Sequence, residues 1–180
     1  MQISKRIVLI VLLVLPGINA NSSGSAWEEK NDKAIIIKMG SVIIEGELGF
    51  NLALTTCSSI SPEIIGGMGL SWEKSYYSSF YSLLSSARYN FAADRTSPFI
   101  CGEIGYAIER VKGISSSITN GPMIGAGVGI NAPARKRLDI FLEVSYKSQW
   151  SRRYLSYYYA NPKSESVRFD MLRFNMGVAF

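Results

Sequence analysis

Residues 171–180, MLRFNMGVAF, alternate strictly between apolar side chains and other side chains. Every second position carries an apolar group: Leu172, Phe174, Met176, Val178 and Phe180. This period of two is that of a β-strand, whose successive side chains point to opposite faces, and it fits no helix. An apolar ladder that reaches a final aromatic is unusual for a strand in water and suits a strand that meets a lipid–water boundary.

The first residues of the chain have the parts of a secretory signal peptide. Lys5 and Arg6 precede an apolar run over residues 7–15, and a helix-breaking Pro-Gly pair follows before the small Ala20. The run is roughly half as long as a membrane-spanning helix requires, which disfavours an uncleaved anchor. We therefore expect a signal peptide, a periplasmic N-terminal segment and one folded domain over residues 1–20, 21–32 and 33–180 respectively.

The composition argues against several classes of function. The 180 residues include no histidine, so the chain lacks the commonest general base and metal ligand. The formal net charge is +5, but the basic residues form no run of the kind that binds nucleic acid. Cys57 and Cys101 have no metal-ligand spacing, and they leave open either one disulfide or two free thiols. We expect no enzyme activity, no cofactor, no metal and no nucleic-acid partner.

The same alternation recurs along the rest of the domain, with turn residues between the repeats. Six further strands are predicted at residues 42–54, 64–73, 83–91, 100–109, 123–131 and 138–150. Together with the terminal strand they make seven, and a closed antiparallel barrel needs an even number. Residues 33–39, ahead of a turn at Gly40-Ser41, are the candidate for the eighth. The predicted fold is an all-β, eight-stranded, antiparallel up-and-down transmembrane β-barrel.

The connectors between these strands differ in predicted length. They are long at residues 110–121 and 151–166, and short at 92–97 and 132–137. Long and short connectors alternate along the chain, so they gather at opposite rims, as in barrels with short periplasmic turns and longer external loops. This asymmetry predicts that the long loops lie outside the cell.

In each strand, the alternate positions that carry the more polar side chains are expected to face a narrow lumen. They are rich in glycine, which suits a space where side chains from all strands compete. They also carry acids and bases that can pair when they are buried together. The expected lumen charge network comprises Glu45, Glu47, Arg88, Glu103, Asp139, Glu143, Lys147 and Arg173, and Glu73 and Glu109 share its parity. The alternative is that this parity is a solvated face around an apolar interior, as in a soluble lipocalin-like barrel.

One predicted loop mixes cations with aromatic side chains. These residues are Arg152, Arg153, Tyr154, Tyr157, Tyr158, Tyr159 and Lys163. Such a mixture would suit the phosphate groups of lipopolysaccharide or a carbohydrate partner. The favoured interpretation is simpler: an aromatic girdle at the membrane boundary followed by a solvated loop.

The signal peptide, strand repeats such as residues 97–106 and the terminal strand ending in Phe180 resemble those of small outer-membrane β-barrels. That class is typified by the transmembrane domain of OmpA and by OmpX, and it is grouped broadly with the porin family. The resemblance implies location in the bacterial outer membrane. It also implies that the barrel-assembly machinery reads the terminal strand, through Phe174, Met176, Val178 and Phe180.

The predicted function is that of a non-enzymatic integral outer-membrane protein with a structural or surface-interaction role. Its expected partners are outer-membrane lipid, lipopolysaccharide, the assembly machinery and an unspecified extracellular partner. An eight-stranded barrel is only wide enough for its own side chains, so a small pore is less favoured. The alternative from another class is a soluble periplasmic lipocalin-like barrel that binds lipid in its interior.

Overall fold

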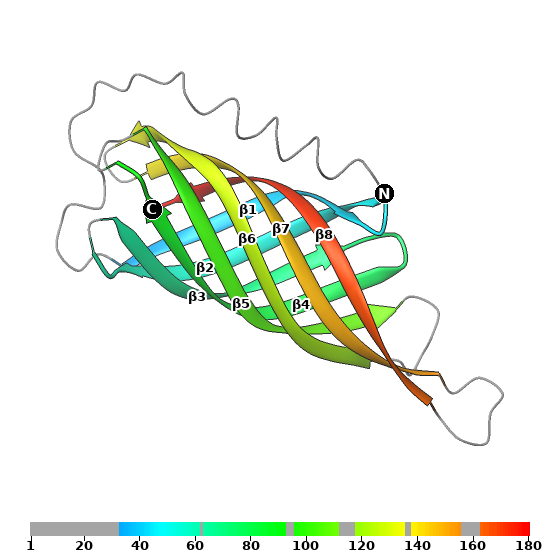
Figure 1. Cartoon of the computed structure of the whole chain (residues 1–180). Coiled ribbons are helices and arrows are strands. Elements are labelled where there is room, and N and C mark those ends of the chain that lie inside the picture. Colours follow the sequence, from blue (N-terminus) through cyan, green and yellow to red (C-terminus); the bar gives the residue numbers. More distant parts are fainter. Residues whose placement is uncertain (1–32, 62, 93–95, 112–117, 136–137, 156–162) are drawn as a thin grey trace.

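The computed structural model describes residues 33–61, 63–92, 96–111, 118–135, 138–155 and 163–180. The predicted signal peptide and N-terminal segment lie outside these residues. The described chain forms β1 (Lys33–Ile44), β2 (Glu47–Ser59), β3 (Ile64–Lys74), β4 (Ser78–Asn90), β5 (Ser97–Val111), β6 (Ile118–Arg135), β7 (Leu138–Leu155) and β8 (Lys163–Ala179). Figure 1 shows these strands wrapped obliquely around one axis.

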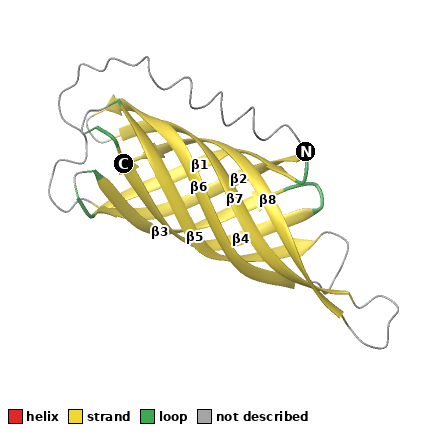
Figure 2. Ribbon diagram, in the orientation of Figure 1, coloured by secondary structure: helices red, strands yellow, loops and turns green. Residues whose placement is uncertain are grey.

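The sheet closes on itself. Each strand pairs antiparallel with its neighbour in sequence, and β1 pairs with β8. The backbone N–H groups of Ile35 and Phe180 donate to each other's carbonyl oxygens, at 2.8 Å and 3.1 Å, and fasten the seam at one end. Figure 2 shows an all-strand architecture, and no described helix is long and apolar enough to span a bilayer. The prediction of an eight-stranded up-and-down barrel is confirmed.

The first hairpin corrects the predicted strand limits. The turn is at Glu45-Gly46, not at Gly40-Ser41, so residues 42–54 are not one strand. Both turn residues have positive φ, 52° and 88°, as a two-residue hairpin turn with strand-compatible twist requires. Ile44 pairs with Glu47, and paired residues share a face. The outward positions are therefore odd-numbered in β1 and even-numbered in β2, which the alternation alone did not reveal.

The two rims differ in how far the strands extend beyond the barrel wall rather than in the lengths of their turns. We call the rim with the Ile35–Phe180 seam the terminal rim and the opposite one the far rim. Three turns at the terminal rim span residues 60–63, 91–96 and 136–137, and four at the far rim span 45–46, 75–77, 112–117 and 156–162. About half of each predicted long loop is therefore strand: six of the twelve residues in 110–121 and nine of the sixteen in 151–166. β7 and β8, of 18 and 17 residues, extend at the far rim as a ribbon beyond the other strands (Figure 1).

The outer wall carries a continuous apolar belt. Burial alternates along the strands, with the apolar parity exposed and the polar parity buried. The belt is made from every part of the wall and includes Met39, Leu54, Met68, Leu70, Leu83, Ile104, Ile124, Leu142 and Phe174. Exposed apolar area on this scale marks contact with lipid or a partner rather than with water. This orientation is that of a membrane barrel and contradicts the lipocalin-like alternative, which requires an apolar interior.

The lumen is filled in layers. An apolar plug near the terminal rim contains Ile36, Cys57, Ile65, Phe99, Phe141 and Ala179. A second plug near the far rim contains Val42, Ile44, Phe80, Phe169 and Met171. Buried charged and amide side chains that include Lys38, Glu103, Glu143, Arg173 and Asn175 occupy the layer between the plugs. The described part of the lumen is therefore packed with side chains, as expected for a barrel of this size.

Candidate functional site

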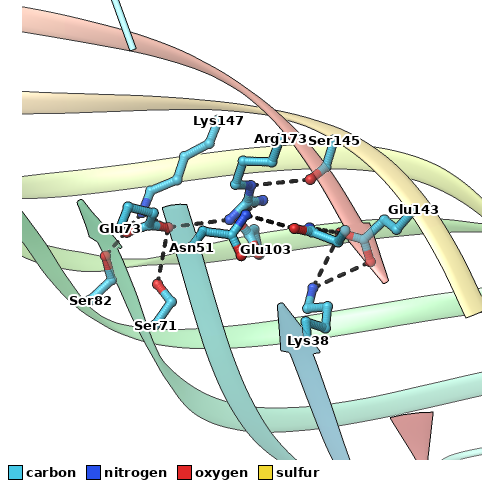
Figure 3. A network of polar contacts seen from close by, with 11 residues as sticks. Lys38, Asn51, Ser71, Glu73, Ser82, Glu103, Glu143, Ser145, Lys147 and Arg173 are labelled. Carbon is cyan, nitrogen blue, oxygen red and sulfur yellow. Dashed lines mark hydrogen bonds and ion pairs between the residues drawn. The ribbon is translucent and has the colours of Figure 1, made fainter. Parts of the chain in front are cut away.

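Arg173 is the centre of the polar layer (Figure 3). Its guanidinium pairs with Glu103 of β5 and lies 3.5 Å from Glu73 of β3. The same group donates to the Ser145 hydroxyl of β7 at 3.1 Å. All of these side chains are buried. One cation of β8 thus links three other strands across the lumen.

Lys147 forms the second half of this centre. Its ammonium donates to Glu73 at 2.8 Å and to the Ser82 hydroxyl at 3.0 Å. Ser71 adds a hydrogen bond to the same Glu73 oxygen at 3.2 Å. Lys147 and Glu73 are both 0% exposed, so the pair is fully screened from water. Ion pairs at such depth persist only when several hydrogen bonds surround them.

A second cluster lies on the side of β1. The Lys38 ammonium donates to both carboxylate oxygens of Glu143 at 3.3 Å. The Asn175 amide donates to the same carboxylate at 3.1 Å, and the Asn51 amide donates to Asn175 at 2.6 Å. Figure 3 shows Lys38 pointing to Glu143 next to the Arg173 centre. Together the two clusters connect seven of the eight strands, all but β6.

Arg88 joins the polar layer to the plug near the terminal rim. Its guanidinium carbon lies 3.9 Å from the ring centre of Phe99 and 4.3 Å from that of Phe141. It also donates to the Asn131 side chain at 3.2 Å. A cation between two aromatic rings is held by the negative faces of their π-systems. The neighbouring cavity, about 20 Å³, has room for roughly one water molecule.

Glycine makes room for the two rings of this plug. A Cβ on Gly129 would lie 2.2 Å from the Phe99 ring, and one on Gly177 would lie 2.3 Å from the Phe141 ring. Each ring covers the glycine directly opposite it on the next strand. Gly129 and Gly177 therefore allow close packing of these two aromatic rings within the narrow lumen.

The structure places most of the expected network residues in the lumen, and it corrects one. Arg88, Glu103, Asp139, Glu143, Lys147 and Arg173 are buried there, as are Glu73 and Glu109. Glu45 is not a lumen residue, because it occupies the exposed hairpin turn. Glu47 is half-buried at the far rim, where it pairs with Ile44. Lys38 was not among the expected residues.

Lys38 was missed because its strand carries apolar residues on both faces. The inward positions of β1 include Ala34, Ile36, Val42 and Ile44, which belong to the interior packing. Ile35 and Met39 face outward on the same strand. Such a strand shows no alternation, so the inward direction of Lys38 is evident only from the pairing with β2 and β8.

The remaining predicted residues divide between described and undescribed parts. Phe174, Met176 and Phe180 are exposed on the outer face of β8, and Val178 is half-buried there. Arg152 is exposed on β7. The strands include Arg153, Tyr154 and Lys163, whose side chains are not described, and Tyr157, Tyr158 and Tyr159 lie outside the described residues. Cys57 and Cys101 are free thiols.

In the lumen, buried carboxylates and buried cations neutralise each other's charge. In the network drawn in Figure 3, the carboxylates of Glu73, Glu103 and Glu143 each accept from a lysine or arginine. Within the described ranges, no group of three acidic or cysteine side chains could hold a metal ion. The arrangement ties strands together across the lumen.

Comparison with known proteins rests on structure alone, since no family model and no curated protein matches the sequence. Neisserial surface protein A matches with a TM-score of 0.66 at 15% identity, over 84% of this chain and 98% of that one. The N-terminal β-barrel domain of Pseudomonas aeruginosa OprF matches with a TM-score of 0.52 at 12% identity, over 84% and 100% of the two chains. The outer membrane protein AlkL matches with a TM-score of 0.53 at 13% identity, over 91% and 94%.

These likenesses confirm the predicted resemblance at the level of fold. The matched proteins are small outer-membrane barrels, and each is covered almost completely by this chain. The apolar belt and the charged, filled lumen independently require that the wall faces lipid. The chain has the fold of small outer-membrane β-barrels, with an apolar outer wall suited to lipid.

Proposed function

We propose that this protein is a non-enzymatic, non-conducting barrel that holds its far rim, with the β7–β8 ribbon, at the cell surface as an interaction platform. The observation that carries the proposal is the sealed lumen: an ion-paired layer between two apolar plugs. A filled interior supports neither diffusion nor an enclosed ligand site. The part of the molecule left for interaction is its outer wall and its far rim.

Planar-bilayer recording tests the sealed lumen. The purified protein is expected to insert without discrete conductance steps, because the central charges are paired and both plugs are buried. The matched measurement uses a larger porin in the same lipid and salt, which shows that channels would be detected. Reproducible conductance steps that depend on the amount of this protein would contradict the proposal.

Surface accessibility tests the orientation. An epitope inserted between residues 156 and 162 is expected to bind antibody on intact cells, since these residues join β7 to β8 at the far rim. The same epitope inserted between Lys136 and Arg137 serves as the control, because that turn is at the terminal rim. It should bind antibody only after the outer membrane is permeabilised. The opposite pattern would overturn the proposed platform.

We also propose that β8 carries the signal for barrel assembly. Its outward residues Phe174, Met176, Val178 and Phe180 form an apolar ladder next to the seam with β1. Replacing Phe180 by Ser is expected to reduce the amount of folded protein in the outer membrane, whereas replacing the outward Phe91 should have little effect. Heat-modifiable gel migration measures the folded fraction. Equal loss in the two variants would indicate a general need for outer aromatics.

A further inference from the structure

The ladder between β6 and β7 ends before the two strands reach the far rim. Pairing between these strands runs from Arg135–Leu138 up to Met123–Gln149 and ends there. Beyond that point residues 118–122 pair with β5 only, and residues 150–155 pair with β8 only. Near the far rim the β5–β6 and β7–β8 ribbons therefore stay in contact, but no backbone ladder joins them. Their outward side chains border a recess in the outer surface.

A cleft of about 500 Å³ lies over this junction on the outer surface. Outward side chains from four strands line it, including Tyr106, Asn120, Pro122, Trp150, Arg152 and Ser166. Its volume lies within the range typical of small-molecule sites. The lining combines flat apolar surfaces with hydroxyl, amide and guanidinium groups. A ligand that is partly apolar and partly anionic would match this combination.

The floor of the cleft is shaped by a close approach of the two ribbons. A Cβ on Gly121 would lie 1.7 Å from the carbonyl oxygen of Trp150, so the β7 backbone occupies the space of a side chain. Below the surface the ribbons are linked from within, since the Ser151 hydroxyl donates to Thr119 at 2.9 Å. The cleft is thus a surface feature with a closed floor, separate from the lumen.

The cleft lies where the apolar belt ends on the side of the far rim. On β8 the outward residues change from Phe174 and Leu172 to Asp170 and Arg168. Arg168 and Asp170 form an exposed ion pair at 2.9 Å, and Arg168 lies 5.8 Å from the Trp150 ring centre. In contrast, Arg152 makes no ion pair with any described residue. Its exposed guanidinium is therefore available to an anion at the height where lipid head groups begin.

We propose that this cleft binds the phosphorylated head group of an outer-leaflet glycolipid. Arg152 would hold a phosphate, as guanidinium groups do with two parallel hydrogen bonds. The amide of Asn120 and the hydroxyl of Ser166 would contact sugar hydroxyls, while Trp150 and Pro122 would cover the apolar faces of the sugar and its acyl chains. The inference rests on the proposed orientation with the far rim outside, and it names the ligand class of that platform.

Native mass spectrometry of the detergent-purified protein tests the site. The probes are lipid A with both phosphates and the same lipid with its phosphates removed. Arg152→Gln is expected to weaken apparent binding of the phosphorylated lipid by about tenfold, the loss of one charge-assisted contact. Lys74→Gln is the matched control, because Lys74 is an exposed cation on β3, outside the cleft. It should change binding less than about twofold.

The phosphate-free lipid supplies the second comparison. It should bind the wild type and Arg152→Gln equally, since the lost contact is to phosphate. Equal weakening by Arg152→Gln and Lys74→Gln would overturn binding in the cleft and indicate diffuse attraction to exposed cations. Unchanged binding by a heat-modifiable Arg152→Gln barrel would also overturn it, yet would leave the proposed platform intact. The platform fails instead if the epitope between residues 156 and 162 is inaccessible on intact cells.

Discussion

At the scale of single residues, the buried pair of Lys147 and Glu73 is the most sensitive point in the lumen. Both side chains are 0% exposed and their charged atoms lie 2.8 Å apart. Removing the ammonium by Lys147→Met leaves the carboxylate in a dry interior with Arg173 at 3.5 Å. The variant is expected to lose about 3–5 kcal/mol of unfolding free energy. Urea unfolding in lipid vesicles measures the change.

A double-mutant cycle provides the control for this prediction. Adding Glu73→Gln to Lys147→Met removes the uncompensated charge, so the double variant should recover a substantial part of the loss. Simple additivity of the two single changes would show that the pair is not energetically coupled. That result would contradict the ionic account of the central layer.

The lumen glycines offer a second residue-scale prediction. Gly129→Ala would place a Cβ 2.2 Å from the Phe99 ring and 2.3 Å from the Leu142 carbonyl oxygen. Relief of this overlap should cost about 1–3 kcal/mol of stability. Gly102→Ala is the matched control, because Gly102 is outward and its nearest described atom is 4.0 Å away. Comparable urea midpoints for the two variants would refute the packing role of Gly129.

At the scale of the element, the β1–β2 turn depends on positive φ at both residues. Gly46→Ala is expected to destabilise the hairpin by about 1–2 kcal/mol, because φ is 88° at this position. Glu45→Asn should be neutral or slightly stabilising, since Asn tolerates the left-handed conformation found at residue 45. Urea midpoints measure both effects. A milder effect of Gly46→Ala than of Glu45→Asn would contradict the turn assignment.

Strands with one apolar and one polar face were predictable from the sequence. Strands with apolar residues on both faces were not. The alternation of β8 predicted its outward residues correctly, because Arg173 and Asn175 mark the lumen side. On β1 the lumen side joins the apolar plugs, so the strand lacked alternation and its turn was misplaced. The charge partners were not predictable either, since pairs such as Lys38 and Glu143 depend on three-dimensional register.

Strand length was underestimated for a related reason. β7 continues through Leu155, and the sequence Ser151-Arg152-Arg153 near its end places polar residues at both parities. Without an apolar face the continuing strand resembles a loop in sequence. The ribbon and the cleft beside it follow from hydrogen-bond pairing that composition does not encode.

At the scale of the whole molecule, the outer belt and the filled lumen are two consequences of one pattern. The apolar side chains face outward, toward lipid. The side chains at the alternate positions face the lumen, where opposite charges meet and water is excluded. Closure between β1 and β8 leaves no unpaired edge within the belt. The molecule therefore requires a bilayer for stability and leaves its rims as the water-facing surfaces.

Quenching by lipids brominated on their acyl chains tests this orientation most directly. Single tryptophans would be placed by Leu54→Trp, Leu70→Trp and Leu142→Trp, with Trp27, Trp72 and Trp150 replaced by Phe. All three sites are exposed on the belt, on β2, β3 and β7. The account predicts strong quenching at each of them in vesicles. Unquenched emission at all three would show that the apolar parity does not face lipid, and would contradict the membrane barrel.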